Sequence, residues 1–325
     1  MSNFVSLTTN SIGLAPSTSL SSPHPSNATT GVISDTADNA AHTQEVSVAP
    51  IKIDLDSVLR TRLASYYRFI PMCVVRWLER TICQDGLNTL LRDNAGLEGA
   101  EFCRGVLRDL DVSYKVEHAD RLPDFEHRRV VFVSNHPLGA LDGIAYIELL
   151  GKLYGKVYFV VNDLLGAVAP LKSVFVQVDK HGRQTKNRVS ELDSVFAGDD
   201  PVLFFPAGLC SRKGDDGTIS DLTWKKTFLT KAIEHKRDIV PLHFGGTNSA
   251  FFYNFARLRS KLGLKFNVEM IYLPREIFLA RGREFTITVG PTISCDSFRG
   301  GSSAMAEAQE VKKMVYSLVT PTGSR

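Results

Sequence analysis

The stretch VVFVSNHPLGALDG, residues 130–143, decides both the expected fold and the expected site. Its first five residues are almost all apolar, which is typical of a strand buried in a sheet. His136 follows this strand directly, and Pro137 biases His136 away from helical geometry. Gly139 permits a tight turn, after which Asp142 is close enough in sequence to fold back onto the imidazole. The sequence thus predicts a histidine at the open end of a buried strand, with an aspartate beside it.

A histidine paired with an aspartate can act as a general base. The carboxylate fixes the tautomer of the ring and stabilises the imidazolium, so the other ring nitrogen can accept a proton. We therefore take His136 as the candidate base and Asp142 as the group that orients it. The nucleophile can be a hydroxyl of the substrate rather than a side chain. Seen alone, a histidine after a strand is more often an ordinary loop residue, and that alternative stays open at this point.

Short apolar runs alternate with helical stretches from about residue 128 to the end of the chain. This alternation predicts an α/β fold: a mixed, largely parallel sheet flanked by helices, preceded by an N-terminal helical segment. Ligands bind such sheets beyond the carboxyl ends of the strands. Three predicted strands end in unusual polar or glycine-containing segments, at 135–137, 206–208 and 243–246. We expect the site where these three segments converge.

The N-terminal 110 residues divide into two parts. Residues 1–50 are rich in Ser, Thr, Asn and Ala and contain no Lys or Arg, so we predict a disordered tail without the features of a signal peptide. Residues 51–110 show helical spacing, with arginines among aromatic residues such as Tyr66, Phe69 and Trp77. That mixture suits helices docked on an anionic membrane surface. The alternative is a helical layer packed on the domain with its arginines in water.

Composition excludes several classes of protein. The net charge of +3 is too small for a nucleic-acid-binding polycation, and no apolar run is long enough for a spanning helix. Five scattered cysteines favour a reducing compartment, and no Cys or His spacing indicates a metal site. The motifs of serine hydrolases, P-loop proteins and dinucleotide-binding proteins are absent.

The segment NHPLGALDG (135–143) resembles the first motif of the glycerolipid and lysophospholipid acyltransferases, in which four residues separate a histidine from an aspartate. Four later segments resemble further blocks in the order of that family: VFVQVDK (174–180), FFPAGLCSR (204–212), WKKTF (224–228) and IVPL (239–242). The resemblance implies an acyltransferase domain over residues 111–325. The HPLG..DG form and ICQDGLN (82–88) are similar to a hemolysin-like bacterial branch that includes acyltransferases of glycine and ornithine lipids.

The sequence departs from the family pattern at three places. Five residues, not four, separate His136 from Asp142, which gives an HxxxxxD motif. Ala207 stands where the family has glutamate, and Lys180 stands where it has arginine. The family glutamate is associated with a glycerol-phosphate acceptor, so its loss argues against that acceptor. The branch that this sequence resembles implies an amino-acid lipid such as N-acylglycine as the acceptor. The alternatives left open are lysophosphatidic acid, another glycerolipid or an amine as the acceptor, and a non-catalytic lipid-binding protein on the same fold.

The resemblance implies direct acyl transfer. His136 would deprotonate the hydroxyl of a lipid acceptor, which attacks an acyl thioester of acyl carrier protein or coenzyme A, while backbone N–H groups near Gly208 stabilise the oxyanion. No other cofactor is implied. The thioester, the lipid acceptor and a membrane surface are the expected partners, and nucleic acid is not. We expect a peripheral protein on the cytoplasmic face of the inner membrane.

The resemblance also assigns contacts with the substrates. Arg212, Lys225 and Lys226 would hold an anionic head group or the phosphate of phosphopantetheine. The two lysines could instead mark a solvated helix start, and Lys180 and Arg183 could be surface residues. His243 is expected to be structural. The full predicted set comprises Asn135, Gly139, Lys180, Arg183, Phe205, Pro206, Gly208, Ser211, Arg212, Lys225 and Lys226.

Overall fold

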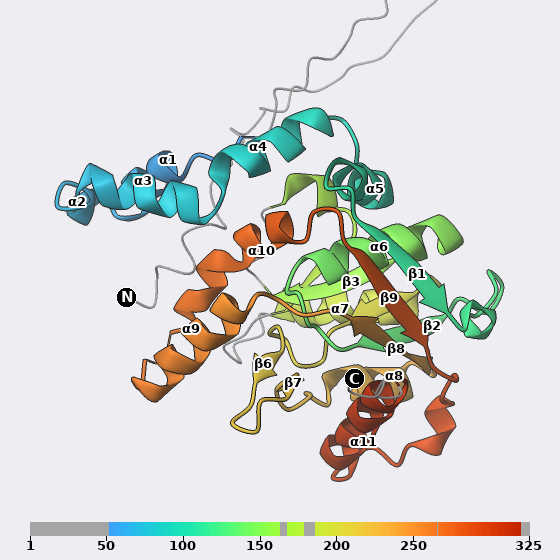
Figure 1. Cartoon of the computed structure of the whole chain (residues 1–325). Helices are drawn as coiled ribbons and strands as arrows, with labels where there is room; N and C mark the ends of the chain where they lie inside the picture. Colours follow the sequence, from blue (N-terminus) through green and yellow to red (C-terminus); the bar gives the residue numbers. More distant parts are fainter. Residues whose placement is uncertain (1–51, 163–167, 179–185, 265, 320–325) are drawn as a thin grey trace, which may run out of the picture. The chain divides into compact units, whose positions relative to one another are not determined.

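A computed structural model describes residues 52–162, 168–178, 186–264 and 266–319 (Figure 1). The predicted tail, residues 1–50, lies outside these ranges. The described part contains a seven-stranded sheet in the order β1-β9-β8-β2-β5-β3-β4. In that order the strands are Ser113–Glu117, Glu284–Val289, Asp238–Gly245, Val130–Ser134, Val202–Phe204, Tyr158–Asn162 and Phe175–Val178. Neighbouring strands are parallel except for β8 and β9, so the predicted mixed, largely parallel sheet is confirmed.

The strand β2 lies at the centre of this sheet, and all five of its residues are buried. Val133 pairs with Phe204 of β5 on one side and with Pro241 of β8 on the other. Residues 135–137 and 206–208 follow β2 and β5 and therefore leave the same end of the sheet side by side. The third segment was expected to begin after its strand, but residues 243–245 still belong to β8, which continues past the end of β2 and places Phe244 beside Asn135.

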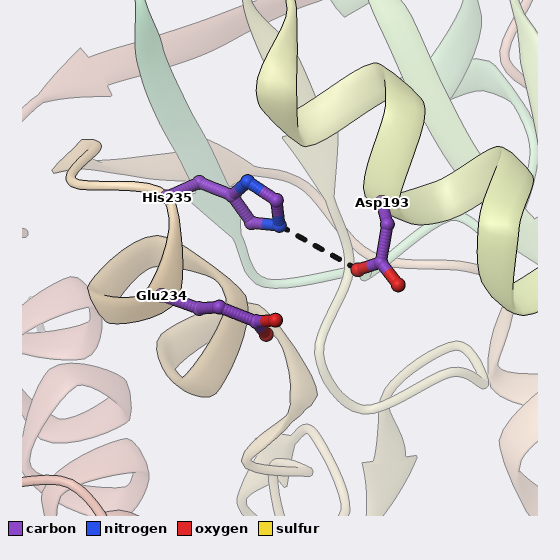
Figure 2. Close-up of side chains that lie close together, drawn as sticks. All are labelled: Asp193, Glu234 and His235. Carbon is purple, nitrogen blue, oxygen red and sulfur yellow. Dashed lines mark ion pairs between the residues drawn. The ribbon is translucent and has the colours of Figure 1, made fainter.

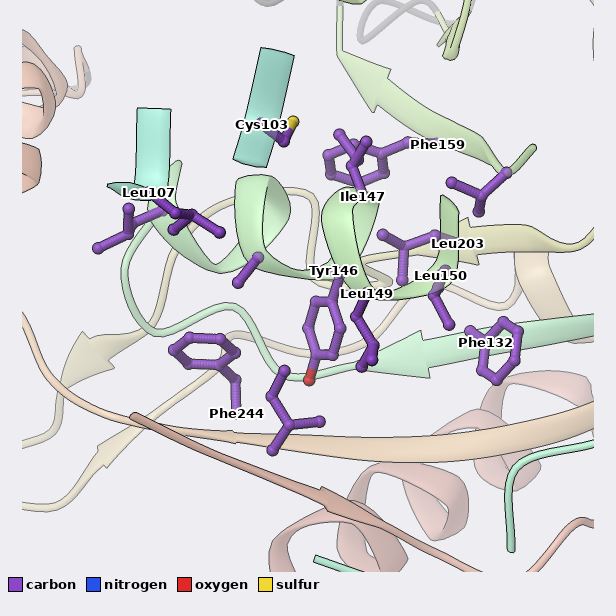
Figure 3. Packing of buried hydrophobic residues seen from close by; sticks show 14 of the residues in the cluster. Cys103, Leu107, Phe132, Tyr146, Ile147, Leu149, Leu150, Phe159, Leu203 and Phe244 are labelled. Atoms are coloured by element: carbon purple, nitrogen blue, oxygen red, sulfur yellow. The ribbon is translucent and has the colours of Figure 1, made fainter. Parts of the chain in front are cut away.

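Helices cover both faces of the sheet. One face packs against α5 (Gly99–Asp109) and α6 (Leu141–Tyr154) through a core that includes Phe132, Tyr146 and Phe159 (Figure 3). The other face packs against α7 (Lys186–Ala197), α8 (Thr227–Glu234) and α11 (Ala304–Ser317). Side chains alternate along β2, with Phe132 in the first core and Val131 and Val133 in the second. Burial on both faces explains the unbroken apolar run of this strand.

The N-terminal segment contains α1 (Leu55–Arg62), α2 (Ala64–Tyr67), α3 (Met72–Thr81) and α4 (Gln84–Asp93). Leu59, Val75 and Leu78 form a small core of their own, against which Ile271 packs. Within the described residues, no helix combines the length and the apolar character needed to cross a membrane.

The structure contains elements that the sequence pattern did not predict. The strand β1 alternates between exposed and half-buried residues, so it lacks the apolar run of a central strand. The helices α9 (Ala250–Lys261) and α10 (Leu273–Leu279) keep Phe251, Leu258 and Leu279 exposed, which hides their helical period. Four 3₁₀ turns and a small hairpin complete the described elements: Ala119–Arg121, Ala169–Leu171, Val268–Tyr272 (η4) and Cys295–Ser297, with β6 (Arg212–Lys213) and β7 (Ile219–Ser220).

A fully buried arginine joins α7 to the sheet. The guanidinium of Arg237 donates to the carbonyls of Val195 and Phe196 at the end of α7, at 3.2 and 2.7 Å. It also donates to the carbonyls of Asp200 and Val130, at 2.9 and 3.3 Å. The last carbonyls of a helix have no partner within the helix, so this side chain satisfies groups that would otherwise be buried without one.

Replacing Arg237 with methionine should lower the free energy of unfolding by about 3 kcal/mol, because several buried carbonyls lose their donor. Urea denaturation followed by circular dichroism measures this change. The neighbouring exposed Lys236 provides the control, since Lys236→Met should change the same quantity by less than about 0.5 kcal/mol. Equal changes in the two variants would contradict the capping role.

Candidate active site

The structure brings His136 and Asp142 together at the carboxyl end of β2. Nδ1 of His136 lies 3.0 Å from Oδ2 of Asp142. The carboxylate is fully buried, whereas 11% of the histidine side chain is exposed. One ring nitrogen thus faces the buried carboxylate, and Nε2 is the nitrogen that remains to accept a proton. Insertion of one residue, relative to the family motif, does not prevent the contact.

The carboxylate of Asp142 sits where its negative charge is stabilised. It accepts hydrogen bonds from the backbone N–H groups of Leu138 at 3.0 Å, Gly139 at 3.4 Å and Gly143 at 2.9 Å. Asp142 also lies in the first turn of α6, where the helix dipole favours a negative charge. The loop therefore folds around this carboxylate, and the carboxylate in turn holds the imidazole.

A second buried carboxylate positions the backbone of His136. Oδ1 of Asp221 accepts hydrogen bonds from His136 N at 3.1 Å and from Oγ of Ser211 at 2.6 Å. Oδ2 accepts from Nε1 of Trp224 at 2.9 Å, and Ser211 N donates to the carbonyl of His136 at 2.8 Å. Ser211, a predicted substrate contact, therefore braces the histidine loop. Sequence reasoning missed Asp221, whose only signal was an acid between two blocks of the family pattern.

Two further predicted residues shape the same loop. The amide of Asn135 donates from Nδ2 to the carbonyl of Phe244 at 2.9 Å and accepts from Phe244 N at 2.7 Å, which extends the pairing of β2 with β8. Gly139 has φ of +80°, and a Cβ there would lie 2.9 Å from Leu273 Cδ2. Substrate contact by either residue stays a prediction, because these observations concern the fold of the loop.

The segment after β5 forms the wall beside the imidazole. The ring of Phe205 stacks on that of His136, with 4.0 Å between centroids and 21° between planes. The carbonyl of Pro206 accepts from Lys225 N at 3.0 Å. Gly208 N donates to the carbonyl of Phe205 at 2.9 Å, so this N–H closes the turn. The role of neighbouring N–H groups as oxyanion donors stays a prediction.

The predicted cations differ in what they offer a substrate. Nη2 of Arg212 lies 2.8 Å from Oε1 of the fully buried Glu269, whose other oxygen lies 2.9 Å from Nε of Arg259. Arg212 and Arg259 thus share one protein carboxylate, and contact of Arg212 with an anionic head group stays a prediction. Lys225 and Lys226 are exposed just before α8. Lys180 and Arg183 lie outside the described residues.

Cys210 packs against the histidine loop, since a Cβ at Gly139 would lie 3.2 Å from Cys210 Cβ, and its side chain is fully buried. Burial raises the pKa of Cys210 to about 11, so the thiol is neutral near pH 7. A neutral, buried thiol is a poor nucleophile. The site therefore favours direct transfer between two substrates over a covalent intermediate on this cysteine.

Comparison with known proteins decides the family. Residues 57–322 match a family model described as acyltransferase. The chain belongs to this acyltransferase family. It is 42% identical over 267 residues to the lyso-glycine lipid O-acyltransferases of Bacteroides thetaiotaomicron and Phocaeicola vulgatus. The matches cover 82% of this chain and 97% and 95% of those proteins. The expected resemblance to glycerolipid acyltransferases, and with it the enzyme class, is confirmed.

A solved structure is also similar to this acyltransferase. It is the 1-acyl-sn-glycerophosphate acyltransferase of Thermotoga maritima, with 15% identity and a TM-score of 0.42. The match covers 83% of this chain and all of that one. The α/β fold of our chain is established by its own strand order and strand pairing.

A group of metal-ligating residue types lies away from the histidine loop, between α7 and α8 (Figure 2). Nε2 of His235 is 3.5 Å from Oδ1 of Asp193, and Glu234 lies beside them. The ammonium of Lys231 forms ion pairs with both Asp193 and Glu234, and its hydrogen bond is the main reason why the pKa of Asp193 is lowered. Both carboxylates thus already pair with a protein cation.

His243 of β8 packs against Tyr316 of α11. Its ring lies edge-on to that of Tyr316, with 5.8 Å between centroids. Burial lowers the pKa of His243 from 6.5 to about 4, so the imidazole is neutral near pH 7.

The free energy of unfolding should fall as the pH falls from 6.5 to about 4. In this range His243 is protonated in the unfolded chain but stays neutral in the folded chain. Replacing His243 with phenylalanine should remove roughly 1–3 kcal/mol of this decline. Urea denaturation at several pH values measures it. His118→Asn, at an exposed histidine, serves as the control substitution. Parallel curves for His243→Phe and the unsubstituted protein would refute this account.

Proposed function

We propose that this acyltransferase moves a fatty acyl group from a thioester to a hydroxyl of a lyso-glycine lipid, or of a closely related amino-acid lipid. The observation that carries the mechanism is the contact of His136 with the buried carboxylate of Asp142 at the carboxyl edge of the sheet. The proposed acceptor is supported by the two relatives with 42% identity, whose names state that activity and whose length this chain nearly covers.

In the proposed reaction, Nε2 of His136 takes the proton of the acceptor hydroxyl as its oxygen attacks the thioester carbonyl carbon. A C–O bond forms, and the carbonyl oxygen becomes an oxyanion. When the oxyanion collapses, the C–S bond breaks and the imidazolium returns its proton to the leaving thiolate. The products are an ester and a free thiol, and His136 ends neutral. The carboxylate of Asp142 stabilises the imidazolium while it exists.

The donor we propose is a thioester of acyl carrier protein or coenzyme A. The thioester supplies the activated acyl group, so the proposed reaction requires no resident cofactor. Lysophosphatidic acid, another glycerolipid and an amine are the competing acceptors, and a lipid-binding protein without catalysis is the competing class.

Radiolabelled palmitoyl thioesters of both carriers should label a lyso-glycine lipid when they are incubated with the purified protein. Replacing His136 with alanine should lower kcat by about 10³-fold, because the general base is lost. Replacing Asp142 with asparagine should lower kcat by about 10²- to 10⁴-fold, because an amide favours the wrong tautomer and does not stabilise the imidazolium. Thermal unfolding of both variants controls for folding.

The acceptor panel separates the alternatives. It contains a lyso-glycine lipid, a lyso-ornithine lipid, lysophosphatidic acid and glycerol 3-phosphate. If only a phosphate-bearing acceptor became labelled, the proposed amino-acid lipid would be the wrong acceptor. Retention of full activity by His136→Ala would refute the mechanism, and no transfer to any acceptor would favour the lipid-binding alternative.

We further propose that the N-terminal helices dock this acyltransferase on the cytoplasmic face of the inner membrane. Exposed aromatic side chains gather on α2, α3 and the turn between them: Tyr66 is 70% exposed, Phe69 69% and Trp77 52%. The guanidinium of Arg68 lies 4.7 Å from the ring centroid of Phe69. Exposed apolar rings among arginines match the acyl and phosphate layers of an anionic bilayer. Cytoplasmic thioester donors would meet a membrane lipid on this face.

The double variant Phe69→Ser/Trp77→Ser should bind anionic phospholipid vesicles about 10-fold more weakly, because two rings no longer enter the interface. Vesicle flotation measures the binding. A matched control is available at Phe125, which is 56% exposed and has Arg128 4.1 Å from its ring centroid. Phe125→Ser should leave flotation unchanged. If Phe125→Ser weakened vesicle binding as much as the double variant does, docking through α2 and α3 would be contradicted.

A further inference from the structure

A cavity of about 270 Å³ lies beside the histidine loop. Leu138 and Leu141, both within the segment that joins His136 to Asp142, form part of its wall. Ile277 and Leu279 of α10 provide apolar lining from another element. Leu279 is also 49% exposed, so the apolar side of the cavity continues to the protein surface. Space of this kind beside a catalytic loop suits part of an amphipathic substrate.

The polar side of the cavity is bonded to the catalytic loop. Thr247, Asn248 and Ser249, which connect β8 to α9, line it. Nδ2 of Asn248 donates to the carbonyl of Pro137 at 3.1 Å, and Asn248 N donates to the hydroxyl of Tyr253 at 3.1 Å. Asn248 is buried, so the cavity wall is tied directly to the residue that follows His136.

Two charged side chains line the cavity, and their surroundings differ. The carboxylate of Glu276 accepts from both N and Oγ of Ser249, each at 2.7 Å. The guanidinium of Arg283 lies 4.9 Å from the ring centroid of the buried Phe285, and its Nη1 is 3.4 Å from the carbonyl of Thr247. Among the described residues, no carboxylate lies within ion-pair distance of Arg283. Arg283 is therefore held by the ring and the carbonyl and forms no ion pair with a described carboxylate, although the carboxylate of Glu276 lines the same cavity.

We infer that this cavity binds the head group of the acceptor lipid and that Arg283 pairs with its carboxylate. This inference rests on the proposed function and adds the residue that selects the acceptor. A cavity of about 270 Å³ suits a small amino-acid head group but not a whole lipid. The fatty chains would leave past the apolar side at Leu279. A planar guanidinium offers a carboxylate two parallel hydrogen bonds.

The test compares a lyso-glycine lipid with its methyl ester, which removes the negative charge and adds one methyl group. For the free acid, Arg283→Gln should raise KM at least 10-fold with little change in kcat, because the variant loses ground-state binding rather than the base. For the methyl ester, Arg283→Gln and the unsubstituted protein should have the same KM. Arg283→Lys should restore part of the affinity, since it keeps the charge without the planar fork.

Arg281 is the matched control, because it is also exposed, lies two residues away and does not line the cavity. Arg281→Gln should leave KM for both acceptors unchanged. Titration calorimetry with N-palmitoylglycine, which lacks the acceptor hydroxyl, gives a second readout that requires no turnover. Arg283→Gln should weaken this binding at least 10-fold.

The outcomes separate the two proposals. If the unsubstituted protein acylates no lyso-glycine lipid, the proposed function fails. If it does, and Arg283→Gln shows the same preference for free acid over ester as the unsubstituted protein, the inference about Arg283 is overturned. Equal effects of Arg281→Gln and Arg283→Gln would also overturn it, because general surface charge would then explain the result.

Discussion

The buried carboxylate of Asp142 is the constraint on which the site depends. A charge without solvent must be compensated, and here three backbone N–H groups, a helix start and the imidazole of His136 compensate it. These contacts fix the loop that leaves β2, since Leu138 and Gly139 must point their N–H groups at the carboxylate. The same carboxylate therefore both fixes the conformation of the loop and orients the base.

A second buried carboxylate, that of Asp221, holds the same loop from the other side. It accepts hydrogen bonds from the backbone N–H of His136, the hydroxyl of Ser211 and the indole N–H of Trp224, which come from three separate segments. The backbone and the ring of His136 are thus held by different acids. Rigid placement of a general base matters because proton transfer requires a short contact with the substrate.

Two arginines near the histidine loop show how the surroundings of a side chain decide what it can bind. Arg212 and Arg283 are chemically identical, but Arg212 faces the buried Glu269, whereas Arg283 rests on an aromatic ring at the rim of a cavity. Arg212 shares the carboxylate of Glu269 with Arg259, whereas Arg283 forms no ion pair with a described carboxylate. Sequence similarity pointed to Arg212, and only the surroundings of each side chain direct attention to Arg283.

The sequence by itself determined the α/β architecture, the position of the histidine loop and the family, because these depend on local patterns: apolar runs, turn residues and ordered motifs. Burial and contact at long range were decided only by the tertiary structure. Glu269 lies 57 residues from Arg212, and Asp221 lies 85 residues from His136, so no local sequence pattern predicts either contact. The helices α9 and α10 were missed for a related reason, since their exposed apolar residues disguise the period from which a helix is normally recognised.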